Sequence, residues 1–195
     1  KPHTIFLVGG FSFCAMNYRI CGMRRALPQK WFRRPTLEVA RDVLGKFLVV
    51  RAANGTHTAR MIMDVEAYDG FQDKASHAAR GKTQRNAPMF EAGGIWYVYF
   101  IYGMHEMLNV VTGPNRYPAA LLIRGVEKAN GPGKLTKQLG ITRAHNGLPA
   151  SRISGLWIED RGIVIPKQNV KTSPRIGVGY AGLVWAQKRY RFFLA

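Results

Sequence analysis

The residues that could carry out chemistry begin with a short stretch at positions 61–68, MIMDVEAY. Apolar residues recur at every second position, which predicts a β-strand. Successive strand side chains point to opposite faces, so Asp64, Glu66 and Tyr68 share one side. A carboxylate beside an aromatic ring suits an enzyme that holds a flat ring and activates a water next to it. The same pattern also fits an edge strand with a solvated glutamate and a half-buried tyrosine, because exposed carboxylates are common.

A second candidate is the aromatic stretch around residues 97–104, YVYFIYGM. Tyr97 and Tyr99 share one face of a predicted strand, and aromatic faces bind unpaired bases by stacking. We expect Tyr97 to pack within a sheet. Tyr102 and Met104 lie at a predicted turn, where a large apolar side chain is costly unless it binds something. An apolar hairpin tip of this kind can wedge into a base stack.

Two basic positions complete the candidate chemistry. Arg124 ends an apolar strand, where it is either an edge residue or the partner of a buried carboxylate such as Glu66. Residues 131–140 predict a helix start that carries Lys134. Helix starts bind phosphate through free N–H groups, although a plain helix start fits equally well. The spacing of a Walker loop is absent.

Strands outnumber helices among the elements that must position these residues. One helix is expected over 37–44, capped by Thr36, and another after Gly131. The Asn54–Gly55 pair predicts a hairpin between strands at 47–51 and 60–68. Further strands are expected at 94–103, 105–112, 119–126, 156–159, 162–165 and 189–194, with a turn at Glu159–Asp160. Short turns between strands predict a single α+β domain, with a curved, mainly antiparallel sheet flanked by helices. We assign this domain to residues 31–195 and leave residues 1–30 as a tail without a function.

The charge balance is the most distinctive feature of the composition. Lys and Arg total 29 against 11 for Asp and Glu, which gives a formal net charge of +18. Such a chain attracts polyanions, with nucleic acid first and an anionic membrane second. We find no basic amphipathic helix of the kind that lies on a membrane surface, which disfavours the membrane as the partner. Cys14 and Cys21 both lie in the tail, and the five histidines have no metal-ligand spacing, so we expect a reducing compartment and no metal.

The order of the motifs resembles the 3-methyladenine (alkyladenine) DNA glycosylase family from about residue 37 to residue 193. The matching stretches are residues 64–68 (DVEAY), His77, 83–86 (TQRN), Met89–Phe90, 97–104 (YVYFIYGM), Asn109, 121–124 (LLIR), 131–135 (GPGKL) and 175–182 (RIGVGYAG). The resemblance implies a monofunctional enzyme that flips a damaged purine out of duplex DNA and hydrolyses its N-glycosidic bond. It implies no cofactor, a monomer, no membrane, and a location in the bacterial cytoplasm or nucleoid, or in a eukaryotic nucleus.

The resemblance also implies residue roles. Glu66 is then the general base for the attacking water, which Arg124 and the main chain at Val178 help to hold. The flipped base is sandwiched by Tyr68, His77 and Tyr99, and Asn109 rejects the exocyclic amine of guanine. Tyr102 fills the gap in the duplex beside Met104, and Lys134 lies near the DNA backbone.

Two other functions fit parts of the pattern. Charge and tyrosines alone would equally suit a nucleic-acid-binding module without activity. A hydrolase acting on a ribosyl bond in a nucleoside or in RNA is the other alternative. Abasic sites left in lesion-bearing duplex DNA would distinguish the glycosylase from both.

Overall fold

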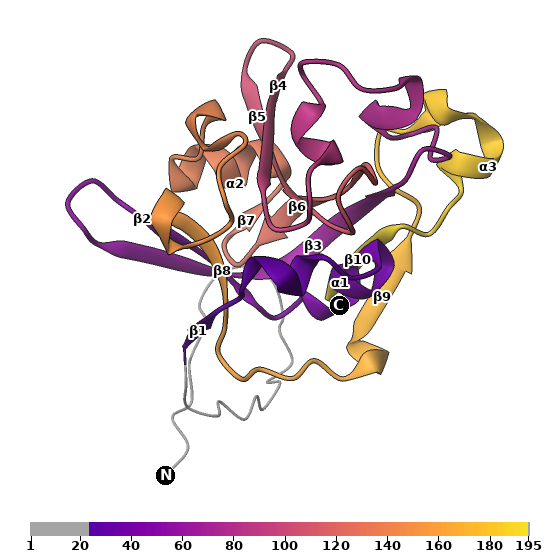
Figure 1. Ribbon diagram of the computed structural model, residues 1–195. Helices are drawn as coiled ribbons and strands as arrows, with labels where there is room; N and C mark the ends of the chain where they lie inside the picture. The colour runs from indigo at the N-terminus through magenta and orange to yellow at the C-terminus, as the bar shows by residue number, and fades with distance from the viewer. Residues whose placement is uncertain (1–23, 195) are drawn as a thin grey trace.

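The computed structural model describes residues 24–194 as one α+β domain (Figure 1). Most of the predicted tail therefore lies outside the described residues. Within the described part of that tail, Arg25–Ala26 form a short strand and Leu27 is buried in the core. Within residues 24–194, no helix is long and apolar enough to cross a membrane.

Ten strands form the sheet, and every pairing between them is antiparallel. Their bounds are β1 Arg25–Ala26, β2 Phe47–Arg51, β3 His57–Asp69, β4 Trp96–Ile101, β5 His105–Val111, β6 Ala119–Val126, β7 Ala129–Asn130, β8 Leu156–Asp160, β9 Val170–Ser173 and β10 Arg191–Leu194. The main order is β1-β8-β2-β3-β6-β5-β4, with β7 on β6 and with β10 between β3 and β9. The predicted fold class, including its antiparallel sheet, is confirmed.

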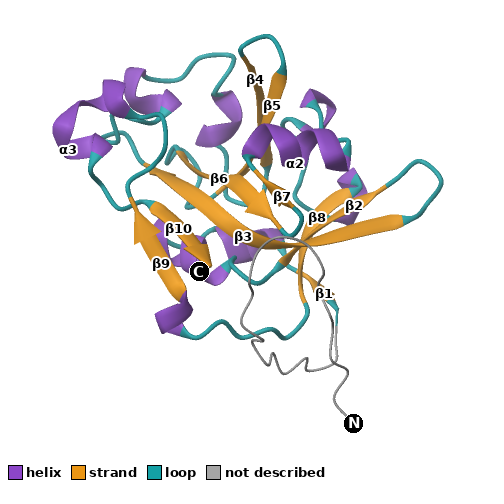
Figure 2. Cartoon of the chain, turned by 180° about the vertical axis from the view of Figure 1, so that it is seen from behind, coloured by secondary structure: helices purple, strands orange, loops and turns teal. Residues whose placement is uncertain are grey.

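Within the described part of the chain, three α-helices flank the sheet: α1 Thr36–Asp42, α2 Pro132–Leu139 and α3 Gly182–Ala186. Short 3₁₀ turns occur at Gln29–Phe32, His77–Arg80, Ala87–Phe90, Arg143–His145, Arg152–Ser154, Lys167–Asn169 and Gly179–Ala181. Seen from behind, α2 lies beside β5, β6 and β7 (Figure 2). The apolar sides of the sheet, α1 and α2 enclose one main core, which includes Phe32, Val39, Trp96 and Leu135.

Strand β3 organises the sheet because its two halves have different partners. Its first half pairs with β2, as the Asn54–Gly55 hairpin predicts. Its second half lies between β6 and β10, where Glu66 is opposite Leu122 on one side and Arg191 on the other. The register between β3 and β6 is irregular from Ile62 to Val65, where β3 changes partners. Such bulges alter the direction of the side chains that follow. The alternative of an edge strand at residues 61–68 is therefore wrong.

Several smaller predictions are corrected. Thr36 does not cap α1, because Pro35 occupies the N-cap position and the Thr36 hydroxyl donates to the Asp69 carboxylate at 2.7 Å. Residues 162–165 form no strand. Glu159 is not in a turn but is buried in β8, where its carboxylate accepts hydrogen bonds from the Trp157 indole and the Arg161 guanidinium. Neither β9 nor α3 was predicted.

Candidate active site

The Glu66 carboxylate is fully buried at the centre of the sheet and has three partners. The Tyr68 hydroxyl donates to its Oε2 at 3.0 Å, and the Ile176 backbone N–H donates to its Oε1 at 2.8 Å. Arg124 Nη1 lies 3.3 Å from Oε1. A buried carboxylate is costly unless it is paired and hydrogen-bonded, and these contacts fix both of its oxygens in one orientation.

The pKa of Glu66 is raised above its ordinary value. Burial is the largest cause, and it outweighs the opposing effects of Arg124, the Ile176 N–H and the Tyr68 hydroxyl. Burial disfavours the charged form because the low-dielectric interior solvates it poorly. A raised pKa makes this carboxylate a stronger proton acceptor than a solvated glutamate, as a general base requires.

Arg124 lies between two carboxylates of β3. Besides Glu66, its Nε is 3.8 Å from Asp64 Oδ2. Asp64 itself accepts bidentate hydrogen bonds from the guanidinium of Arg191 on β10, the shortest of them 2.8 Å long. Bidentate pairs of this kind are geometrically specific. Asp64 thus has a structural partner of its own. The Arg124 Nε is buried and has no hydrogen-bond partner among the described residues, so Asp64 contributes only a charge contact to it.

An aromatic pocket opens beside Glu66. It is lined by Tyr68, Ala75, His77, Met89, Tyr97, Tyr99, Asn109, Ala120 and Tyr180. The rings of His77 and Tyr99 lie edge to face with centroids 4.6 Å apart, and His77 Nδ1 is 2.9 Å from the Tyr97 hydroxyl. The predicted set of Tyr68, His77, Tyr99 and Asn109 therefore shares one pocket, and Tyr97 is buried in the sheet as expected.

The pKa of His77 is lowered, first by desolvation among these rings and second by the positive charge of Arg85. Both causes disfavour the imidazolium form. The ring is therefore held in its neutral form. A neutral ring is a suitable stacking surface for a flat base, including a cationic one. Arg85 also lies over the Tyr99 ring, 5.4 Å from its centroid.

The amide of Asn109 has a defined orientation at the pocket wall. Its Nδ2 donates to the carbonyl oxygens of Tyr97 at 3.0 Å and of Met107 at 3.1 Å. The flipped amide would place Oδ1 against two acceptors, so the hydrogen-bond network selects this orientation. Both donors are thereby occupied, and Oδ1 is the polar atom left for a ligand.

The predicted DNA contacts lie at the hairpin tip between β4 and β5, at the top of Figure 1. Tyr102 and Met104 are both exposed there, and Tyr102 has a positive φ of 52°. A non-glycine residue in this conformation is strained, and such strain clusters at functional sites. Lys134 is exposed in the first turn of α2, next to Gly133, and Gly133 packs against His105 at the tip end of the hairpin.

A buried ion pair that the sequence did not reveal joins two sides of the site. Arg175 Nη2 donates to Asp73 Oδ1 at 2.8 Å, and both side chains are fully buried. Arg175 also donates to the Ala67 carbonyl at 2.8 Å and lies over the Tyr68 ring. The pair connects the loop before His77 with the segment that supplies the Ile176 N–H. No sequence signal links two residues that are 102 positions apart.

The segment after Arg175 was expected to contribute the main chain of Val178. That residue is buried, and its carbonyl oxygen accepts from the Ala181 N–H at 3.0 Å. The backbone group that hydrogen-bonds to Glu66 is the N–H of Ile176, two residues before Val178. Tyr180, which was also not predicted, lines the pocket and donates to the Ala75 carbonyl at 2.9 Å.

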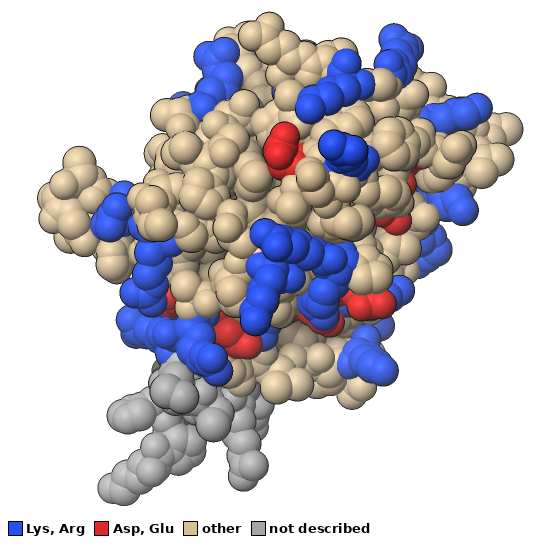
Figure 3. All heavy atoms as spheres, in the orientation of Figure 1, with Lys and Arg blue, Asp and Glu red and all other residues tan. Residues whose placement is uncertain are grey.

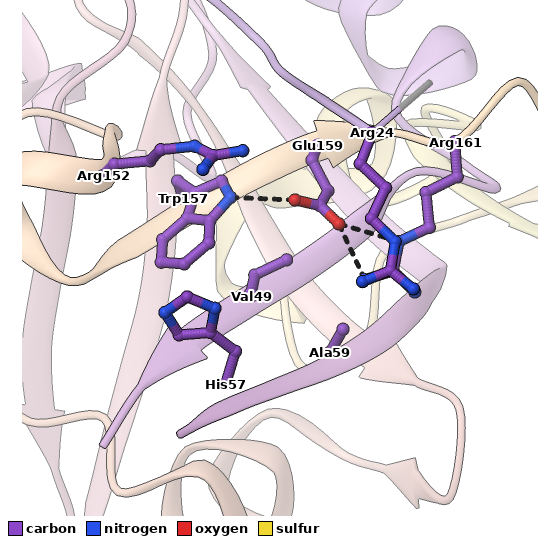
Figure 4. A pocket seen from close by; sticks show the side chains of 8 residues that line it. All are labelled: Arg24, Val49, His57, Ala59, Arg152, Trp157, Glu159 and Arg161. Carbon is purple, nitrogen blue, oxygen red and sulfur yellow. Dashed lines mark hydrogen bonds and ion pairs between the residues drawn. The ribbon is translucent and has the colours of Figure 1, made fainter. Parts of the chain in front are cut away.

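A second cavity, of about 170 Å³, lies at the other end of β3 (Figure 4). Its lining residues are Arg24, Val49, His57, Ala59, Arg152, Trp157, Glu159 and Arg161. Ala59 is seven residues from Glu66, which is roughly 23 Å along a strand at about 3.3 Å per residue. Its one carboxylate, Glu159, is held by Trp157 and Arg161, so the cavity offers no free carboxylate.

The described residues contain no group of three or more His, Cys, Asp and Glu side chains that could hold a metal ion. Lys and Arg side chains are spread over the face seen in Figure 3, where Asp and Glu are few. A buried carboxylate beside an aromatic pocket, in a chain of net charge +18, fits an enzyme of the DNA glycosylase class.

Comparison with known proteins specifies the class further. The model of the methylpurine-DNA glycosylase family matches residues 30–129 and 126–195. A protein of Myxococcus xanthus named "Putative 3-methyladenine DNA glycosylase" is 42% identical over 181 residues, which cover 86% of this chain and 89% of that protein. A protein of the same name from Methanocella arvoryzae is 44% identical over 176 residues, covering 80% and 86%. This chain belongs to the methylpurine-DNA glycosylase family, which confirms the resemblance found in the sequence.

Proposed function

We propose that this DNA glycosylase excises alkylated purines of the 3-methyladenine type and deaminated purines such as hypoxanthine, and thereby starts base excision repair. The observation that carries the proposal is the buried Glu66 carboxylate, which is held by Arg124 and the Ile176 N–H beside a pocket of aromatic rings. The names of the relatives support the 3-methyladenine part of the specificity.

In the proposed reaction the damaged nucleotide rotates out of the duplex, which costs a few kcal/mol and least for weakly paired lesions. Tyr68, His77 and Tyr99 then sandwich the base. Glu66 accepts a proton from a water whose oxygen attacks C1′ of the deoxyribose. The C1′–N bond breaks, its electron pair leaves with the base, and an abasic sugar remains. Arg124 and the main chain at Val178 hold the water.

The lesion itself sets how much help the base needs in leaving. An alkylated adenine is cationic and leaves easily, whereas neutral hypoxanthine depends more on the pocket. A neutral His77 ring avoids charge repulsion with the cationic lesion, and its lowered pKa keeps it in that form. We propose that Asn109 excludes normal guanine sterically, because the carbonyls of Tyr97 and Met107 hold its amide in place and it cannot turn away from the guanine amino group.

The experiment that tests the proposal uses a panel of duplexes with single hypoxanthine, 3-methyladenine or normal purine residues. Each is incubated with the wild-type protein and treated with alkali, which cleaves abasic sites. We expect cleavage at the lesions and none at normal purines. Binding without cleavage at any lesion, or activity only on free nucleosides or RNA, would contradict the proposal.

We propose that Tyr102 is the wedge that fills the gap left by the flipped base, with Met104 beside it and Lys134 near a phosphate. Tyr102→Ala should weaken binding of a lesion duplex about tenfold, because stacking contributes roughly 1–3 kcal/mol per base. Tyr102→Phe keeps the ring and should bind as the wild type does. Tyr97→Phe, within the sheet, should lose less than Tyr102→Ala. Fluorescence anisotropy on a lesion duplex measures all three, and equal losses in them would exclude the wedge.

A further inference from the structure

A run of exposed apolar side chains extends over residues 176–184. Leu183 and Val184 are 85% and 70% exposed, and Ile176 and Tyr180 are also exposed. We call these four side chains the 176–184 ridge. The first and the last of them are eight residues apart in the sequence. Large apolar side chains grouped on a surface mark a binding site more often than single ones do.

The 176–184 ridge is continuous with the active site. The backbone N–H of Ile176 holds Glu66, and Tyr180 lines the aromatic pocket and is tied to Ala75. Tyr102 is also nearby: the pKa of Tyr180 is raised first by burial, and the Tyr102 hydroxyl adds to the shift. In both ribbon views α3 and the β4–β5 tip lie in the upper half of the molecule, the tip at the top and α3 to one side of it (Figures 1 and 2).

The local backbone explains why Leu183 and Val184 project. Gly182 has a φ of 78°, a backbone conformation that residues other than glycine rarely adopt. The chain therefore turns sharply between the 3₁₀ turn and α3. Helix α3 has only five residues, and none of them is buried. Lys188 is exposed just beyond it and forms no ion pair within residues 24–194, which favours an anionic partner.

From this placement we infer that the 176–184 ridge is a second apolar contact to the duplex, which packs against sugars and base edges beside the flipped nucleotide. The inference rests on the proposed base flipping. Proteins that open a base stack commonly insert apolar side chains in the minor groove, where contact offsets the cost of unstacking. With Tyr102 on the hairpin and Leu183 on α3, the extruded nucleotide is flanked by apolar contacts from two elements, and Lys188 adds a phosphate contact.

The test compares two double variants of the full chain. Leu183→Ser/Val184→Ser removes the tip of the ridge. Ile153→Ser/Val164→Ser is the matched control, since these side chains are 86% and 81% exposed and lie outside the ridge. Anisotropy is measured with a hypoxanthine duplex, an undamaged duplex and a hypoxanthine single strand, all in a Glu66→Gln background. We expect the ridge variant to bind the lesion duplex about tenfold more weakly, while the control changes less than twofold and both keep the parent melting temperature.

Three outcomes would overturn the inference: unchanged binding of the lesion duplex by the ridge variant, an equal loss in the control, or an equal loss on the single strand. The last would place the contact on the flipped nucleotide and not on the duplex. The outcome is independent of catalysis. If the wild type leaves no abasic sites while the ridge variant still loses lesion binding, the proposed reaction fails and the duplex contact stands.

Discussion

Glu66→Gln is expected to bind lesion duplexes as tightly as the wild type and to excise the base about a thousandfold more slowly. The amide has the shape of the carboxylate and keeps an oxygen for Arg124 and the Ile176 N–H. It cannot accept a proton from water, and a positioned general base contributes roughly 10²–10⁴ in rate. Single-turnover rates on hypoxanthine and 3-methyladenine duplexes measure the effect. The loss should be larger for hypoxanthine, because the cationic base leaves with less help.

Glu159→Gln is the matched control, since Glu159 is also a buried carboxylate held by a guanidinium but lies in β8, away from the pocket. It should excise at the wild-type rate. If both variants lost the same activity, or if Glu66→Gln kept its activity, Glu66 would not be the base.

The pH profile provides a second measure of the same assignment. A general base works only when it is deprotonated, and burial raises the pKa of Glu66. Excision of neutral hypoxanthine should therefore rise with pH through a midpoint above that of an ordinary glutamate and then level off. The residual rate of Glu66→Gln should show no such step.

The strands around Glu66 could be predicted because their information is local. Alternation in residues 61–68 placed Asp64, Glu66 and Tyr68 on one side, and the Tyr68 hydroxyl does reach Glu66. Arg124, on the neighbouring strand β6, pairs with Glu66 as the rarity of unpaired buried charge suggests. Composition predicted a polyanionic partner, with nucleic acid as the first candidate, and the order of motifs predicted the family.

The parts that could not be predicted depend on the distant segments that meet in the fold. Asp73 lies in a polar loop that resembles any surface turn, and only the fold brings Arg175 against it. Residues 162–165 have the composition of a strand but form none, whereas Val170–Ser173, which the sequence did not single out, pairs with β10. The glycine-rich sequence of residues 175–182 did not predict that the exposed helix α3 follows it.

The Asp73–Arg175 ion pair leads to the largest expected change in stability. Asp73→Asn leaves a buried guanidinium without its carboxylate, and breaking a buried pair costs about 3–5 kcal/mol. For a domain with a total stability of about 5–15 kcal/mol, the loss should lower the melting temperature by roughly 10 °C. Denaturant unfolding measures the free energy. Asp42→Asn is the control, because it breaks the exposed pair with Arg34, which contributes at most about 1 kcal/mol.

The double variant Asp73→Leu/Arg175→Met separates stability from positioning. Replacing a whole buried pair by apolar side chains is often neutral or stabilising, so this variant should regain most of the free energy lost in Asp73→Asn. Its excision should remain at least tenfold below the wild type, because the guanidinium contacts that hold the Tyr68 ring and the segment before Ile176 against the loop before His77 are lost. Small misplacements of catalytic groups are costly. If both stability and excision recover fully, the ion pair contributes only to stability. If stability recovers alone, the ion pair also holds the two sides of the active site together.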